Sequence, residues 1–183
     1  MAVSATKLIA VFALAAWASA TSSMSNQCAA SSGPLVTPVL ELYTSEGCSS
    51  CPPADKWAST LKGKDLVVQA FHVGYWDYIG WVDRFAAPAH TTSQREVANR
   101  NRLRSIYTPQ VVVNGRDWPQ WHGAEQRISG QKEAAQIRIE LRQLAGDQFE
   151  AVVTPVNAAA PVPAWAAYWT VTEHGHNLKV KAG

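Results

Sequence analysis

The feature that most constrains this chain is a pair of cysteines, Cys48 and Cys51, with two serines between them and two prolines directly after them. A short β-rich run at residues 39–43 precedes the pair, and a helical pattern at residues 54–62 follows it. Proline is well tolerated in the first turn of a helix. The pattern therefore predicts that the pair lies where a strand passes into a helix.

A second apolar run lies at residues 66–73, after Gly63 has ended the helix. Strand, helix and strand within about 35 residues are typical of a β-α-β unit, in which the two strands are parallel and the crossover is right-handed. We therefore expect the cysteine pair inside the first connection of such a unit.

A second helix is predicted after the loop at residues 74–89, which is dense in aromatic side chains. Thr92 or Ser93 can cap this helix, with Glu96 three residues after Ser93 as the partner in a capping box. We expect the helix to run to about Ser105.

Beyond this helix the chain is rich in predicted strands. Residues 110–113 form an apolar run, and the Asn-Gly dipeptide after it is the strongest short hairpin signal. A helical pattern at residues 124–135 comes next. The remaining strands predict a β-rich appendage built from hairpins, at residues 137–141, 149–156, 166–172 and 178–181.

A Cys-x-x-Cys pair at a strand-to-helix junction is typical of redox chemistry. Unpaired N–H groups and the helix dipole stabilise a thiolate there, so we expect Cys48 to attack and Cys51 to resolve the mixed disulfide. A structural staple gains most from closing a long loop, and this loop is short. A structural staple stays open as an alternative, as does a copper or zinc site completed by His72 or His90.

Three polar residues near the pair have alternative roles. His72 lies near the end of a predicted strand. It either faces the active-site edge or is a core or surface histidine whose hydrogen bonds are satisfied by its neighbours. Asp77, among aromatic residues, is either a proton carrier or a local cap for N–H groups. Glu46 either raises the thiol pKa as a nearby negative charge or is a solvated turn residue. The aromatic loop lines a groove for a peptide or another apolar ligand, or forms a packed lid, through Tyr75, Trp76, Tyr78 and Trp81.

The first residues of the chain predict export. Lys7 gives a positive start, residues 8–17 are apolar but short for a bilayer span, and residues 18–20 are the small Ala-Ser-Ala of a cleavage site. We therefore expect a signal peptide at residues 1–20 and a periplasmic or secreted mature protein, in a compartment where disulfides persist. A short membrane anchor is the alternative. No later stretch is long and apolar enough for stable membrane insertion.

The segment at residues 21–38 is small, polar and interrupted by glycine and proline, so we predict a disordered linker there. It contains Cys28, the odd one of three cysteines, which we expect to be a spare thiol. The formal net charge is only +2, and the arginines near the second helix fall at mixed helical phases. Nucleic acid is therefore not indicated as a partner.

Four blocks of sequence carry a resemblance to known proteins: residues 42–55, 71–81, 94–95 and 107–115. They resemble a family of secreted, thioredoxin-like bacterial proteins of uncharacterised function, marked by a Gly-Cys-Ser-Ser-Cys-Pro-Pro motif. A proline that starts a strand after threonine is where a cis peptide can occur. The resemblance implies that Pro109 lies against the disulfide and helps the backbone of Thr108 pair with an incoming chain.

We therefore predict an α/β protein with a thioredoxin/glutaredoxin-like domain at residues 39–135 and a β-rich appendage at residues 136–183. Members of the resembled family continue past the position of Gly183, so we expect the appendage to be incomplete. The predicted function is that of a thiol–disulfide oxidoreductase or redox-responsive protein. It would exchange with protein or small-molecule thiols and disulfides and use no cofactor. The alternative is a non-enzymatic binding module, either a copper or zinc carrier or a protein-interaction domain.

The residues expected to carry the predicted chemistry come from three segments of the chain. The catalytic group is Cys48, Cys51 and Pro109. The substrate-binding group is Thr108, Tyr75 and Trp76.

Overall fold

The computed structural model describes residues 28–122, 128, 133–158, 167–176 and 179–180. The predicted signal peptide and the first residues of the predicted linker lie outside these ranges. The protein is a mixed α/β chain with two sheets and two α-helices among the described residues. In these ranges, no helix combines the length and apolarity that crossing a bilayer needs.

The larger sheet has four strands in the order β3-β2-β4-β5. They are β2 (Val39–Thr44), β3 (Val67–His72), β4 (Gln110–Val113) and β5 (Arg116–Asp117). The β2 strand pairs parallel with β3, as the β-α-β pattern predicts, and antiparallel with β4. The Asn-Gly turn joins β4 to β5 as an antiparallel hairpin, which is also as predicted. The carboxyl ends of β2 and β3 and the start of β4 therefore meet at one edge of the sheet.

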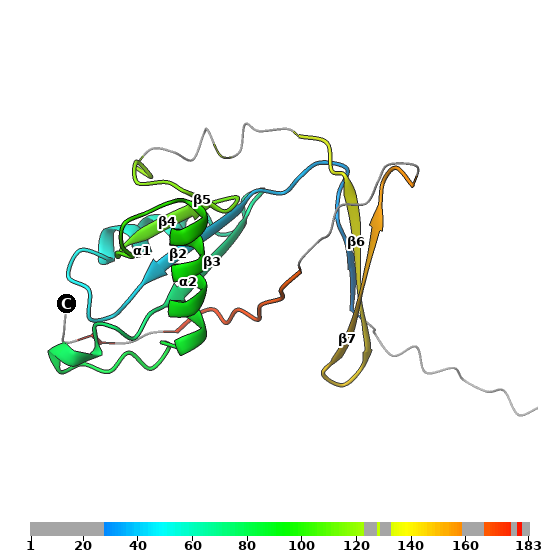
Figure 1. Cartoon of the computed structure of the whole chain (residues 1–183). Coiled ribbons are helices and arrows are strands. Elements are labelled where there is room, and N and C mark those ends of the chain that lie inside the picture. The colour runs from blue at the N-terminus through cyan, green and yellow to red at the C-terminus, as the bar shows by residue number, and fades with distance from the viewer. Residues whose placement is uncertain (1–27, 123–127, 129–132, 159–166, 177–178, 181–183) are drawn as a thin grey trace, which may run out of the picture.

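The two helices cover opposite faces of this sheet (Figure 1). Successive side chains of a strand point to opposite faces. Leu40 and Leu42 belong to one apolar cluster with residues of α1 (Pro52–Thr60), whereas Tyr43 belongs to another with Val97 of α2 (Pro88–Arg100). β2 is thus buried on both faces, and its carboxyl end is held firmly between the two layers.

The prediction for α2 is wrong at both ends. The helix begins at Pro88 and not after Thr92 or Ser93, since proline has the φ angle that the first helical position requires. The Ser93 hydroxyl instead hydrogen-bonds the Tyr43 hydroxyl at 3.0 Å. The helix ends at Arg100, because Arg102 has a left-handed φ of 56° that stops the helical path before Ser105.

The smaller sheet consists of β1 (Ala29–Ser31), β6 (Ile137–Ala145) and β7 (Gln148–Pro155), all antiparallel. In Figure 1, the β6–β7 hairpin stands beside the larger sheet. The hairpin falls at two of the strands predicted for the β-rich stretch, at residues 137–141 and 149–156. Strand β1 falls in the segment predicted as a disordered linker, and it is ordered because its backbone pairs with β6.

The strand predicted at residues 166–172 is wrong for the described residues 167–172, which have no strand partner there. They lie along the larger sheet, where the Tyr168 hydroxyl donates to Glu41 at 2.7 Å and Gln69 contacts Thr170. Apolar alternation alone predicts a strand, but a strand needs a neighbour to pair with. Of the helix predicted at residues 124–135, the described Ile128 is helical and residues 133–135 are not, and the other residues lie outside the described ranges. The strand predicted at residues 178–181 is wrong for the described residues 179–180, and residues 178 and 181 lie outside the described ranges.

Tyr43 makes the stability of the sheet dependent on pH. Burial raises the pKa of Tyr43 from 10.0 to about 12. The stability contributed by its neutral hydroxyl is therefore complete below pH 10 and is lost as the pH rises toward 12. A shift of this size corresponds to about 3 kcal/mol at most.

We expect the free energy of unfolding of Tyr43→Phe, measured by urea titration, to fall less steeply between pH 10 and 12 than that of the wild type. Tyr78→Phe is the matched control, because that ring is 80% exposed, and it should keep the wild-type slope. Parallel curves for Tyr43→Phe and the wild type would contradict the assignment.

Candidate functional site

Cys48 and Cys51 form a disulfide in the connection between β2 and α1. The helix begins at Pro52, so Cys51 and not Cys48 is its N-cap residue. Cys48 lies in the turn before the helix, with its N–H donating to the Ser45 carbonyl at 3.1 Å and its carbonyl accepting from the Cys51 N–H at 3.2 Å. The expectation that Cys48 lies at the helix N-terminus is therefore wrong. Cys48 lies in the turn before the helix, because the fixed φ of proline starts the helix at Pro52.

The two sulfurs differ in their surroundings. Cys48 is 2% exposed and Cys51 is fully buried. The Cys48 sulfur lies 3.5 Å from the hydroxyl of the exposed Ser50, which can donate to a thiolate at this position. Of the two cysteines, Cys48 is the outer one and has its own hydroxyl donor.

Thr108 and Pro109 lie at the same sheet edge, and the peptide bond between them is cis, as the sequence suggested. The last pair in the β2–β4 register is Tyr43 with Gln110. Continuing this antiparallel register places Pro109 beside Thr44, the last residue of β2, and Thr108 beside Ser45, in the segment that leads to Cys48. The structure thus brings the predicted docking residues to the same edge as the disulfide.

Asp55 lies one helical turn after Cys51, and its N–H donates to the Cys51 carbonyl at 3.1 Å. Side chains on a helix lean toward its N-terminus, so the Asp55 carboxyl lies over the turn that contains Cys51. The Thr44 hydroxyl is beside this carboxyl without a regular hydrogen bond. Burial raises the pKa of Asp55, while Thr44 and the nearby His72 oppose the rise. The sequence offered one signal for this residue, the spacing of four from Cys51.

His72 is paired with a buried carboxylate, because its Nδ1 lies 2.7 Å from Asp83 Oδ2. The same carboxylate oxygen accepts from the Glu46 N–H at 2.9 Å, and Oδ1 accepts from the Phe85 N–H. Asp77 caps a local N–H group, that of Asp83, at 3.2 Å. Asp83 was missed in the sequence, because nothing in its spacing points to His72 or Glu46.

The aromatic loop contacts both sides of the disulfide connection. The Trp76 indole N–H donates to the Thr108 hydroxyl at 2.8 Å, and the Trp81 indole N–H donates to Glu46 Oε2 at 2.6 Å. Glu46 therefore has a partner and is not merely a solvated turn residue. The Tyr75 hydroxyl is buried near Gln94 and Thr108, and burial raises its pKa.

A buried polar network supports the start of β4. Gln94 of α2 donates to the Tyr107 carbonyl at 2.8 Å and to the Gln110 side chain at 2.9 Å. The Gln110 amide and the Tyr107 hydroxyl both donate to Asp117. Sequence reasoning assigned no role to these side chains, which fix the segment that carries Thr108 and Pro109.

The residues weighed for metal binding do not gather around the sulfurs. Nδ1 of His90 lies 2.8 Å from the His72 carbonyl oxygen, and His72 itself faces Asp83. Across the described ranges, no three side chains of histidine, cysteine, aspartate or glutamate are arranged to hold a metal ion. Cys28 is a free, exposed thiol, as predicted.

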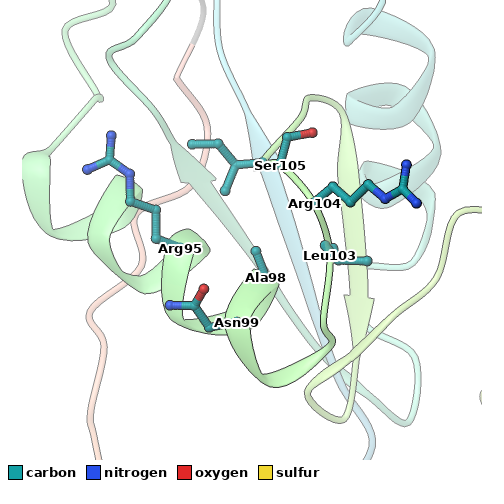
Figure 2. A pocket seen from close by; sticks show the side chains of 7 residues that line it. Arg95, Ala98, Asn99, Leu103, Arg104 and Ser105 are labelled. Carbon is teal, nitrogen blue, oxygen red and sulfur yellow. The ribbon is translucent and has the colours of Figure 1, made fainter.

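A shallow hollow beside α2 contains none of the site residues (Figure 2). It lies between the helix and the segment at residues 103–106. The side chains of Arg95 and Arg104 point away from one another in Figure 2, so they do not form a shared anion site.

The chain is similar to a protein family and to a solved structure. No curated protein matches it. A crystal structure of a protein from Agrobacterium tumefaciens matches at 30% identity over 61% of this chain and 58% of that chain, with a TM-score of 0.49. The model of a family of proteins of unknown function, DUF1223, matches residues 39–183. The chain belongs to this DUF1223 family.

Proposed function

We propose that this protein is an exported thiol–disulfide oxidoreductase with a thioredoxin-like domain, in which Cys48 and Cys51 are the exchanging pair. The observation that carries the proposal is the disulfide itself, placed at the carboxyl end of a central strand with a helix directly after it. A three-residue spacing closes only a small loop, so the bond contributes little as a staple.

In the oxidised protein, a thiolate of a partner dithiol attacks the Cys48 sulfur and the bond to Cys51 breaks. Cys51 leaves as a thiolate, and the second thiol of the partner then displaces Cys48. The partner ends as a disulfide, and two electrons have passed to the cysteine pair. In the reverse direction the Cys48 thiolate, near the Ser50 hydroxyl, attacks a partner disulfide, and Cys51 resolves the mixed disulfide.

Asp55 is the proton carrier that we propose for Cys51. Its carboxyl lies one turn along the same helix, in surroundings that raise its pKa by burial. A carboxyl whose neutral form is favoured can give a proton to the leaving Cys51 thiolate and take it back when Cys51 resolves a mixed disulfide.

The partners that we propose are protein or small-molecule thiols and disulfides, met in the periplasm or outside the cell. Disulfides persist in these compartments. Pro109 and Thr108 border the site, and Tyr75 and Trp76 contribute the aromatic surface beside it. The exchange needs no cofactor, because the two electrons pass directly between the sulfurs of the partner and those of the cysteine pair.

The roles of the two cysteines predict opposite outcomes for two substitutions. In the reduced protein, Cys51→Ser should accumulate a mixed disulfide with a test disulfide, because Cys48 attacks and nothing resolves the product. Cys48→Ser should form no adduct at the remaining cysteine of the pair and should lose dithiol-dependent reduction of the test disulfide. Mass spectrometry of the alkylated products measures both.

Cys28→Ser is the matched control for these variants, because it removes the exposed free thiol and leaves the pair intact. It should reduce the test disulfide at the wild-type rate. Equal activity of Cys48→Ser and the wild type would overturn the enzymatic proposal.

Asp55→Asn should be more stable than the wild type at pH 7 and slower in exchange. The raised pKa means that folding is opposed by the buried carboxylate and favoured by the neutral acid. The stability gain should therefore shrink as the pH falls through the pKa of Asp55 in the folded protein and should vanish below its unfolded value of 3.8.

Urea titrations over this pH range and single-turnover rates of exchange measure the two effects of Asp55→Asn. Lys56→Gln, on the exposed side of the same helix turn, is the control and should change neither. A variant at Asp55 with wild-type exchange rates at every pH would contradict its role as proton carrier.

A further inference from the structure

The disulfide is closed off from solvent in this structure. Cys48 is 2% exposed and Cys51 is fully buried. Exchange requires an attacking thiolate to reach a sulfur atom, so its rate depends on access. Some part of the protein must therefore move before a thiol in solution can attack.

The segment that packs on the connection just before Cys48 is the loop at residues 74–83, which we call the cover loop. It lies directly on Gly47, the residue before Cys48. A Cβ atom placed on Gly47 would lie 3.0 Å from the Trp76 Cβ and 3.3 Å from the Ile79 Cδ1. Glycine is needed at this position because the cover loop approaches the backbone so closely.

The Trp76 side chain bridges the two segments that border the disulfide. Its Cβ stands against Gly47, and its indole N–H donates to the Thr108 hydroxyl at 2.8 Å. Thr108 precedes the proline expected to lie nearest the sulfurs, and the register of β2 with β4 places it beside the residues that follow β2. The indole thus spans the entrance between the β2–α1 connection and the start of β4.

The far end of the cover loop is anchored more strongly than the Trp76 end. Trp81 donates to Glu46, and the buried Asp83 carboxylate accepts from the Glu46 N–H and faces His72. By contrast, one neutral hydrogen bond joins Trp76 to Thr108 in the described structure. Opening at the Trp76 end costs this bond and any ring contacts with Tyr75 and Tyr78 that the motion breaks, and it leaves the Asp83 anchor intact.

We propose that Trp76 is the gating residue of the Cys48–Cys51 pair: its indole, held by Thr108, excludes thiols until the cover loop opens and exposes Cys48. The inference rests on the proposed exchange chemistry of the pair. It makes Trp76 the residue that determines which thiols gain access, because a reactant must meet the open form or displace the indole from Thr108.

The test is the rate at which a small dithiol, dithiothreitol, reduces the disulfide of the full chain. Trp76→Phe keeps an aromatic ring and removes the N–H donor, and Thr108→Val removes the acceptor. Each should speed reduction about fivefold, because losing one neutral hydrogen bond raises the population of the open loop by about that factor. The double variant should be no faster than either single variant, since both remove the same bond.

A gate changes rates in both directions and leaves the equilibrium alone. We therefore expect reoxidation by oxidised dithiothreitol to quicken by the same factor, with an unchanged equilibrium constant. Trp57→Phe is the matched control. The Trp57 ring lies 5.0 Å from the Trp121 ring, centroid to centroid, in the apolar cluster on the α1 face of the sheet, so this variant should react as the wild type does. Unchanged rates in both Trp76→Phe and Thr108→Val, or an equilibrium constant that shifts with the rate, would overturn the gate.

Failure of the gate and failure of the proposed function give different results. If dithiothreitol reduces Trp76→Phe faster but the protein never exchanges with the test disulfide, the gating proposal stands and the oxidoreductase proposal is wrong. If the wild type and both variants exchange with the test disulfide at equal rates, the oxidoreductase proposal stands and the gating proposal is wrong.

Discussion

The pairing of β2 with a parallel neighbour on one side and an antiparallel neighbour on the other is the constraint on which the site depends. It brings the carboxyl ends of β2 and β3 and the start of β4 to one edge of the sheet. The cysteine pair, the cover loop and the Thr108–Pro109 segment each leave or enter the sheet at that edge. Since β2 is buried between two helices, the edge is a rigid base for groups that must meet within a few ångströms.

Around this edge the protein buries polar groups that would be more stable in water. The Asp83 carboxylate is compensated by two backbone N–H groups and His72. Asp55 has weaker compensation, and burial raises its pKa. Burying a carboxyl costs stability unless it is paired, and natural proteins accept such costs chiefly where function requires them. The contrast gives Asp83 an anchoring role and supports our proposal that Asp55 exchanges a proton.

The sequence predicts the parts of the fold that follow from local pattern. β2, β3, β4 and α1 lie within two residues of their predicted bounds, because apolar runs, the two prolines and the Asn-Gly turn are local signals. The start of α2 was missed because Pro88 and Ser93 both suit a helix start, and the tertiary bond from Ser93 to Tyr43 decides between them. Strand β1 and the unpaired residues 167–172 depend on distant partners, which periodicity does not reveal.

The candidate site follows the same division. Cys48, Cys51 and Thr108-Pro109 are recognisable from spacing and residue type. The pairing of His72 with Asp83 and the bridge from Trp76 to Thr108 join residues 11 and 32 positions apart, so only the folded chain reveals them. The sequence showed an aromatic loop with two alternative roles, a ligand groove or a packed lid. The contacts of Trp76 and Trp81 place this loop over the disulfide connection.

The most direct measurement for the proposed function is the reduction potential of the Cys48–Cys51 pair, read from alkylated fractions in a series of thiol–disulfide redox buffers. An exchanging pair should change from disulfide to dithiol in one two-electron step at a potential above roughly −300 mV, where partner thiols outside the cytoplasm can act on it. A bond that stays fully oxidised below that potential would be a structural disulfide and would contradict the account.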